Sequence, residues 1–403
     1  MTQALPQLQS QPQASGKIEE ARGRVKQLVK VLGSRIIGRD EDINMLMTAV
    51  IARENAVMIG PPGTAKTMLI TMLAKLLGAR AYTTLLTRFT GYEDIFGPVD
   101  ILELTKGRYE RKWSNIINAE FIFLDEIFKA NAAILNALLS LLQERVVYDP
   151  MSGVPKPVNA WSVFGASNEV PEDPELQALY DRFPMRIFVN YLDDPSMYLT
   201  ALAARWVGTD GLEPIASMSD VKVLSDYAAS LITARVEDLN APVYRVYNEL
   251  AVPFLLQLRS KGVMVSDRTI IEKGVKLYAA YLVLNGFDIV NVYNAIYKLA
   301  PYFAKDVKEH AEVKKAIEEA RGKIGELAAK LDTARSMAAS GNLAEAKKVL
   351  EDLITNTNIE ELSRTAPYAR PEVEAILKEA NELLEAVKRY INELKGTKWG
   401  GRK

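Results

Sequence analysis

The sequence predicts an α/β core, in which helices cover both faces of a parallel sheet, followed by two all-helical regions. Three observations support this prediction. Short apolar runs alternate with helical periodicity over residues 17–192. No strand pattern follows Asp193, and beyond residue 301 the composition shifts to Ala, Glu, Lys and Leu. We therefore expect a core over 17–192, an all-α domain over 193–300 and a three-helix module over 301–403.

Five apolar runs in the core suit buried strands. They are residues 56–59, 81–86, 121–124, 162–166 and 186–190. Helical spacing between them is clearest over 67–77 and 132–144. The alternation of strands and helices is the order expected of a parallel sheet.

Two segments interrupt this alternation. Residues 99–113 predict a hairpin that turns at 105–107, and residues 146–159 predict another that turns at 149–153. Insertions of this kind often carry specialised contacts. The alternative is that both are ordinary surface hairpins.

The all-α domain begins at Asp194 and Pro195, which supply an N-cap and a proline at the first helical position. Its helices are expected over 221–233, 242–261 and 267–284, with one more reaching Leu299. The C-terminal module is expected to contain helices over 307–337, 343–355 and 371–394, with breaks at 340–342 and 365–367. Either a structural stalk or a partner-docking element fits this pattern.

The composition excludes several classes of function. The 403 residues contain no cysteine, which excludes disulfides and thiolate metal sites. A formal net charge of -1 gives no global field that would attract nucleic acid, and no apolar run is long enough to span a membrane. Residues 1–16 lack a secretory signal and predict a disordered tail, so a cytoplasmic location is expected. The single histidine, His310, lies in a charged helical stretch and is expected to be solvated.

The strongest motif is residues 60–67, Gly-Pro-Pro-Gly-Thr-Ala-Lys-Thr, between the first strand and a helix. A polyphosphate needs backbone N–H donors, a helix N-terminus, a lysine and a hydroxyl that ligates Mg²⁺, and this segment supplies all four. Ala65 replaces the usual second glycine, which adds only a methyl group. The predicted ATP-binding residues are Ile37, Gly60, Pro61, Pro62, Gly63, Thr64, Ala65, Lys66, Thr67 and Met68.

Two carboxylates follow the strand over 121–124. We expect Asp125, with Thr67, to hold Mg²⁺ and Glu126 to polarise the water that attacks the γ-phosphate. An acidic helix cap is the alternative. Asn168 ends another strand, at the same expected sheet edge, where it would orient that water.

Three arginines are candidates for charge neutralisation. Arg182 or Arg186 is expected to reach a neighbouring subunit, and we prefer Arg182, although a salt bridge with Asp181 would also explain it. Arg268, in the first turn of a helix, is expected to point back at the nucleotide. Ile37 is expected to line the adenine pocket, although core packing would also explain it.

This ordered set of residues resembles the AAA+ ATPases. A second set is similar to the MoxR family, nearest its regulatory ATPase variant branch. These residues are Arg88, Phe89, 94–98, 107–111, 123–127, Lys129, Ala130, 134–136 and 265–268. The resemblance implies Walker A, Walker B, sensor 1, arginine finger and sensor 2 roles for the residues above, with the all-α domain as a lid. It also implies a hexameric ring and a partner with a von Willebrand factor A domain.

The resemblance favours a chaperone-like motor that remodels proteins, and two rivals remain open. One is a ring that translocates on nucleic acid, and the other is a nucleotide-switched scaffold that binds through residues 304–403. One departure from the branch is visible: no strand signal follows Pro301, where bacterial members insert a small β-rich domain. Partner contacts made by that domain are therefore not expected here.

Overall fold

The computed structural model describes residues 16–206, 212–232, 242–287, 289–360 and 370–397. The tail predicted over 1–16 lies almost wholly outside these residues. The helix α2 (Gly16–Arg35) begins at its last residue.

A five-stranded parallel sheet forms the core, with the strands in the order β2-β3-β6-β1-β7. The strands are β1 (Ala56–Ile59), β2 (Ala81–Leu85), β3 (Phe121–Asp125), β6 (Ser162–Ser167) and β7 (Met185–Phe188). The prediction of five strands is confirmed, although β7 begins and ends earlier than expected. Because all five strands run in one direction, their carboxyl ends meet at one edge.

Helices cover both faces, as predicted. Phe121 and Phe123 of β3 pack with α2, α3 (Asp40–Ile51) and α4 (Lys66–Leu77). Ile122 and Leu124 point the other way, toward α5 (Tyr92–Phe96), α7 (Ala132–Glu144) and α8 (Pro174–Tyr180). Alternate residues of a strand therefore belong to two separate apolar layers.

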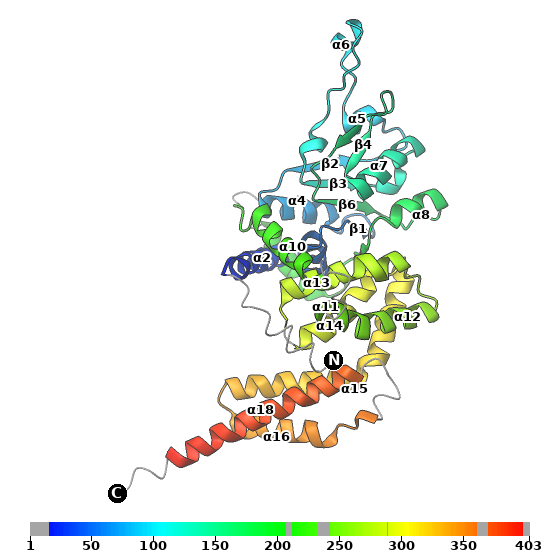
Figure 1. Cartoon of the computed structure of the whole chain (residues 1–403). Helices are drawn as coiled ribbons and strands as arrows, with labels where there is room; N and C mark the ends of the chain where they lie inside the picture. The colour runs from blue at the N-terminus through cyan, green and yellow to red at the C-terminus, as the bar shows by residue number, and fades with distance from the viewer. Residues whose placement is uncertain (1–15, 207–211, 233–241, 288, 361–369, 398–403) are drawn as a thin grey trace.

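The second predicted hairpin is confirmed and the first is wrong at its tip. β4 (Val146–Tyr148) and β5 (Pro155–Pro157) pair antiparallel. Residues 99–113 instead form an arm whose sides meet at a single bridge, Val99 to Arg111, and whose tip is the helix α6 (Ile101–Thr105). The side chain of Asp100 caps α6 by accepting from the backbone N–H of Leu102, which favours a helix over a tight turn. Figure 1 shows α6 at the end of this arm, far from the sheet.

The all-α region, predicted to be a lid, follows β7 and packs on α2 and α3 of the core. Its helices are α9 (Pro195–Trp206), α10 (Met218–Ile232), α11 (Pro242–Val246), α12 (Val252–Ser260), α13 (Gly274–Asn285) and α14 (Ile289–Leu299). Figure 1 shows α10 and α13 close to α2. Two π-helical turns, η4 (Tyr247–Ala251) and η5 (Thr269–Lys273), face each other. The hydroxyl of Tyr247 donates to the carbonyl of Ile270 across 2.9 Å.

The C-terminal module has its own apolar core, and Figure 1 shows it at the opposite end of the molecule from α6. Its helices are α15 (Val307–Ala339), α16 (Leu343–Asn356) and α18 (Arg370–Thr397). The predicted break at 340–342 is confirmed, and the one at 365–367 lies outside the described residues. None of the helices that the structure describes is both long and apolar enough to cross a membrane.

His310 is not solvated, contrary to the prediction. It is half-buried, because α15 begins against β7 and the turn η6 (Ala300–Phe303). Its ring lies against those of Phe188 and Tyr302, and its Nδ1 is 2.8 Å from the carbonyl oxygen of Pro301. Burial lowers the pKa of His310, which favours a neutral packing residue.

Candidate functional site

The loop 60–67 joins β1 to α4 at the carboxyl edge of the sheet. Gly60 is required by space, because a Cβ atom there would lie 1.8 Å from the carbonyl oxygen of Val189. Gly63 has φ +78°, a conformation that glycine adopts without strain. Ala65 has φ 66° and ψ 21°, a left-handed backbone conformation. Its methyl group therefore strains the backbone, which a glycine at this position would not do. A left-handed backbone costs a residue with a Cβ atom about 1–2 kcal/mol.

Lys66 lies within the curve of this loop and is only 9% exposed. Its Nζ donates to the carbonyl oxygens of Gly60 at 2.6 Å and Pro61 at 2.9 Å, and lies 3.4 Å from Oδ1 of Asn168. Burial lowers the pKa of Lys66, while the charges of Asp125 and Glu126 oppose that shift. The ammonium group is therefore held beside the loop, where a polyphosphate would bind.

Oxygen ligands suited to Mg²⁺ lie next to Lys66. The hydroxyl of Thr67 donates to Oδ2 of Asp125 across 3.2 Å. Magnesium prefers such oxygen ligands and is usually held by one or two carboxylates together with phosphate oxygens. Within the described residues, no group of three or more acidic, His or Cys side chains forms a metal site on its own. The residues therefore fit an ion that is shared with a phosphate.

Glu126 follows β3 directly and also has a left-handed backbone, with φ 52° and ψ 44°. Its Oε1 accepts a hydrogen bond from Nδ2 of Asn168 at 2.8 Å, and its Oε2 lies 3.3 Å from Nζ of Lys129. Strained backbone of this kind clusters at functional sites. Lys66, Asp125, Glu126 and Asn168 lie at or just beyond the carboxyl ends of β1, β3 and β6, where they converge.

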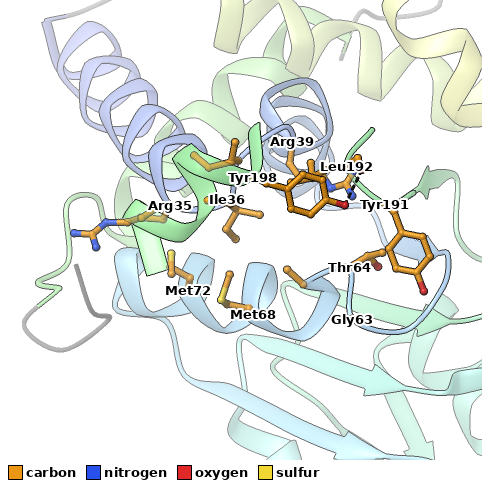
Figure 2. Close-up of a pocket in the computed structure, with 14 residues that line it drawn as sticks. Arg35, Ile36, Arg39, Gly63, Thr64, Met68, Met72, Tyr191, Leu192 and Tyr198 are labelled. Atoms are coloured by element: carbon orange, nitrogen blue, oxygen red, sulfur yellow. Dashed lines mark hydrogen bonds between the residues drawn. The ribbon is translucent and has the colours of Figure 1, made fainter. Parts of the chain in front are cut away.

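An apolar cavity of about 220 Å³ lies beside the loop (Figure 2). Five of the ten predicted ATP-binding residues line it: Ile37, Gly63, Thr64, Ala65 and Met68. Tyr191 and Leu192, which lie between β7 and α9, and Tyr198 of α9 also line the cavity, although the sequence did not indicate them. Tyr198, Ala201 and Ala204 recur every three residues on α9, so helical spacing would have indicated a shared face.

A second cavity, of about 450 Å³, is strongly polar and shares no lining residue with the first. Arg182 and Arg268 both line it, together with basic residues such as Arg145. The expectation that Arg268 points back at the nucleotide of its own chain is therefore not supported. Among the described residues, no hydrogen bond or ion pair holds its side chain.

Arg186 is excluded as the projecting arginine because its side chain is buried within its own chain. Its guanidinium donates to the carbonyls of Phe183 and Phe303, each at 3.2 Å, and pairs with Asp181 at 3.1 Å. The side chain of Arg182 instead donates to Oε1 of Gln143 at 3.1 Å and to the carbonyl of Ala178 at 3.4 Å, at the cavity wall. The salt bridge with Asp181 belongs to Arg186, not to Arg182.

Comparisons with known proteins agree with this geometry. A family model described as the MoxR domain of MoxR-vWA-beta-propeller ternary systems matches residues 23–225. An uncharacterized protein of Methanocaldococcus jannaschii is 32% identical, over 90% of this chain and 97% of its own length. The chaperone MoxR1 of Mycobacterium tuberculosis is 26% identical over 39% of this chain and 41% of its own.

The fold also has a counterpart among solved structures. A candidate ATPase from Cytophaga hutchinsonii superposes with a TM-score of 0.55 at 22% identity, over 74% of this chain and 92% of its own. At this identity the likeness concerns the fold alone. Because the family model covers half of the sequence, including every converging residue at the sheet edge, this chain belongs to the MoxR family of AAA+ ATPases.

Proposed function

We propose that this protein is a Mg-ATP-dependent ATPase that works as a hexameric ring and remodels other proteins. One observation carries the proposal. Lys66, Asp125, Glu126 and Asn168 converge at one site, whereas Arg182 and Arg268 line a separate cavity. An arginine that neutralises γ-phosphate charge must contact the phosphate. A neighbouring chain in a ring would supply that contact, and Arg268 would then act in trans together with Arg182.

The chemistry at the site follows from the geometry. Mg²⁺ held by Thr67 and Asp125 would neutralise phosphate charge, and Glu126 would accept a proton from the attacking water. Asn168 holds Glu126 and Lys66 in one cluster, so base and ammonium keep a fixed separation. Phosphoryl transfer depends mainly on such positioning and charge neutralisation.

A mixing experiment tests the ring. Subunits carrying Arg182→Ala retain their own nucleotide site, and subunits carrying Lys66→Ala retain the second cavity. We expect each variant alone to be nearly inactive and the mixture to recover part of the turnover. Absence of recovery in mixed hexamers, verified by light scattering, would contradict action in trans.

The arm that ends in α6 favours a protein client over nucleic acid. Ile101, Leu102 and Leu104 are 72%, 66% and 49% exposed. The cations beside them are already paired: Lys106 and Arg108 with Glu103, each at 2.8 Å, and Lys112 with Asp100 at 3.3 Å. Cations that are already paired with carboxylates attract the phosphates of a nucleic acid only weakly. Exposed aliphatic side chains are instead suited to bind an apolar polypeptide segment. DNA-stimulated, salt-sensitive turnover would favour the nucleic-acid alternative.

The partner and the branch are parts of the same proposal. The family description names von Willebrand factor A domains, which supports a partner of that kind. Residues 265–268 suggest the regulatory ATPase variant branch, and a cytoplasmic location remains our expectation. Co-purification of the Glu126→Gln variant with a co-expressed domain of this kind, compared with Lys66→Ala, would test the partner. Equal capture by both variants would argue against ATP-dependent binding.

A further inference from the structure

Asn55 occupies a buried position between α3 and β1 and is only 3% exposed. Its Nδ2 donates to the carbonyl oxygens of Leu142 and Arg182, each at 3.1 Å. Its Oδ1 accepts from Nη2 of Arg145 at 2.7 Å and from the backbone N–H of Val163 at 3.2 Å. The amide thus uses two donors and two acceptor positions, which is its full capacity.

These four contacts fix the orientation of the amide. Arg145 and Val163 can only donate, so the oxygen of Asn55 must face them. Both donors of Nδ2 then face the end of α7 and the carbonyl of Arg182. Arg145 is itself anchored on α7, because its Nη1 donates to the carbonyl of Leu142 at 2.9 Å. The backbone of Arg182 is therefore tied to the carboxyl end of a core helix through one side chain.

The position of Asn55 relative to the second cavity gives this network a functional meaning. Asn55, Arg145, Gln143 and Arg182 all line that cavity. Gln143 holds the guanidinium of Arg182, and Asn55 holds its main chain. An arginine that must contact a γ-phosphate on another subunit needs both its main chain and its guanidinium held in place. A displacement of about 1 Å can lower a rate about 100-fold.

We propose that Asn55 is a positioning residue for Arg182, through which it sets the rate of ATP hydrolysis on the neighbouring subunit. This inference rests on the proposed function, in which Arg182 acts in trans. Asn55 is not one of the site residues described above, which are the loop 60–67, the carboxylates of Asp125 and Glu126, and Asn168. A purely structural role for Asn55 is the competing explanation, because buried amides also stabilise folds.

The variant Asn55→Asp separates the two explanations. A carboxylate keeps both acceptor contacts, with Arg145 and Val163, and loses both donors. We expect kcat to fall about tenfold or more, while the affinity for ATP stays within twofold because the nucleotide cavity is separate. Mixing Asn55→Asp with Lys66→Ala subunits should recover turnover. Thr48→Val is the matched control, because it removes a buried hydrogen bond, to the carbonyl of Asn44, within α3.

A double variant gives the decisive measurement. If Asn55 acts through Arg182, Asn55→Asp combined with Arg182→Ala should be no slower than Arg182→Ala alone, within twofold. Multiplied losses, or an unrescued mixture, would overturn the positioning role and leave the proposed function intact. If Asn55→Asp hydrolyses ATP at the wild-type rate, the positioning role is also overturned and the proposed function is left intact.

Other outcomes are equally informative. Full turnover by Arg182→Ala would overturn both the trans mechanism and the role of Asn55. Melting temperature and circular dichroism report whether each variant folds. If Asn55→Asp does not fold, Asn55→Ser, which keeps a single hydroxyl donor, is judged by the same criteria.

Discussion

Asn168 donates from its Nδ2 to Oε1 of Glu126 across 2.8 Å. Asn168 directly follows β6 and Glu126 directly follows β3, and these two strands pair in parallel. The hydrogen bond therefore links the carboxyl ends of two neighbouring strands and holds the proposed base beside the sheet. Support from regular elements fixes the geometry of a site more tightly than a loop alone would.

The first prediction concerns this hydrogen bond. Asn168→Ala should lower kcat about 10–100-fold, because Glu126 loses a fixed partner beside the attacking water. Glu126→Gln should lower kcat at least about 100-fold. ATP affinity, measured by calorimetry, should change little in either variant. Asn159→Ala, at an exposed asparagine of the same domain, is the control, and an equal loss there would contradict the assignment.

The second prediction concerns the left-handed backbone of Ala65. Ala65→Gly removes the Cβ strain, and the greater freedom of glycine in the unfolded chain offsets part of this gain. We expect the free energy of unfolding to rise by up to about 1 kcal/mol. Ala203→Gly, at an exposed position in α9, should instead destabilise by about 1 kcal/mol. Urea unfolding of both variants checks the sign, and equal destabilisation would refute the strain.

Local patterns predicted the sheet and its carboxyl edge well. The apolar runs and the loop 60–67 are signals within a few residues, so strands, P-loop and carboxylate pair could be located from the sequence. The arm over 99–113 could not, because its turn residues fit a hairpin and only the cap at Asp100 reveals a helix. The solvent exposure of His310 was predicted wrongly for a similar reason. Its neighbours in the sequence are charged, and they do not indicate that its ring packs against Phe188 of β7.

The parts of the site that the sequence did not predict depend on contacts between distant segments. Nothing near Asn55 indicates that its amide meets residues 142, 145, 163 and 182, because those contacts exist only after the sheet forms. Arg186 lies in the apolar run 186–190 that predicted a buried strand, whereas Arg182 precedes that run. The carbonyl groups of residues 303 and 304 that accept from Arg186 belong to a distant segment, so these partners have no local signature.

The third prediction concerns the joint between the arm and the β4–β5 hairpin. Nε of Arg111 lies 2.6 Å from Oδ2 of Asp149, and the two side chains are 4% and 2% exposed. The hydroxyl of Tyr109 also donates to Asp149, at 2.7 Å. Removing one partner of a buried pair leaves an uncompensated charge, so Asp149→Asn should destabilise the protein by about 3 kcal/mol or more.

The pH dependence of this joint follows from the same contacts. Burial alone would raise the pKa of Asp149, but Arg111, the N–H of Ser152 and Tyr109 hold that pKa well below its usual range. The stabilisation is thus present above pH 4 and is lost as the pH falls further. Asp226→Asn, in an exposed pair with Lys222, should change stability by less than about 0.5 kcal/mol. Comparable losses in both variants would contradict a special role for the joint.

The fourth prediction concerns Asp42, at the start of α3. Burial raises its pKa to about 6, although Arg39 and a hydrogen bond from Tyr302 partly oppose this shift. The native state therefore binds more protons than the unfolded chain between about pH 4 and pH 6. The contribution of Asp42 to stability falls as the pH rises through that window, and the cost persists at pH 7.

Replacing the carboxylate should remove this cost. Asp42→Asn keeps an acceptor for the hydroxyl of Tyr302 and should raise the free energy of unfolding at pH 7 by about 1–3 kcal/mol, since one pKa unit corresponds to about 1.4 kcal/mol. The gain over wild type should shrink toward pH 4, where Asp42 is protonated in the native state. Urea unfolding from pH 4 to pH 7 measures the difference, with Asp226→Asn as the control. Parallel curves for Asp42→Asn and wild type would show that Asp42 does not titrate near pH 6.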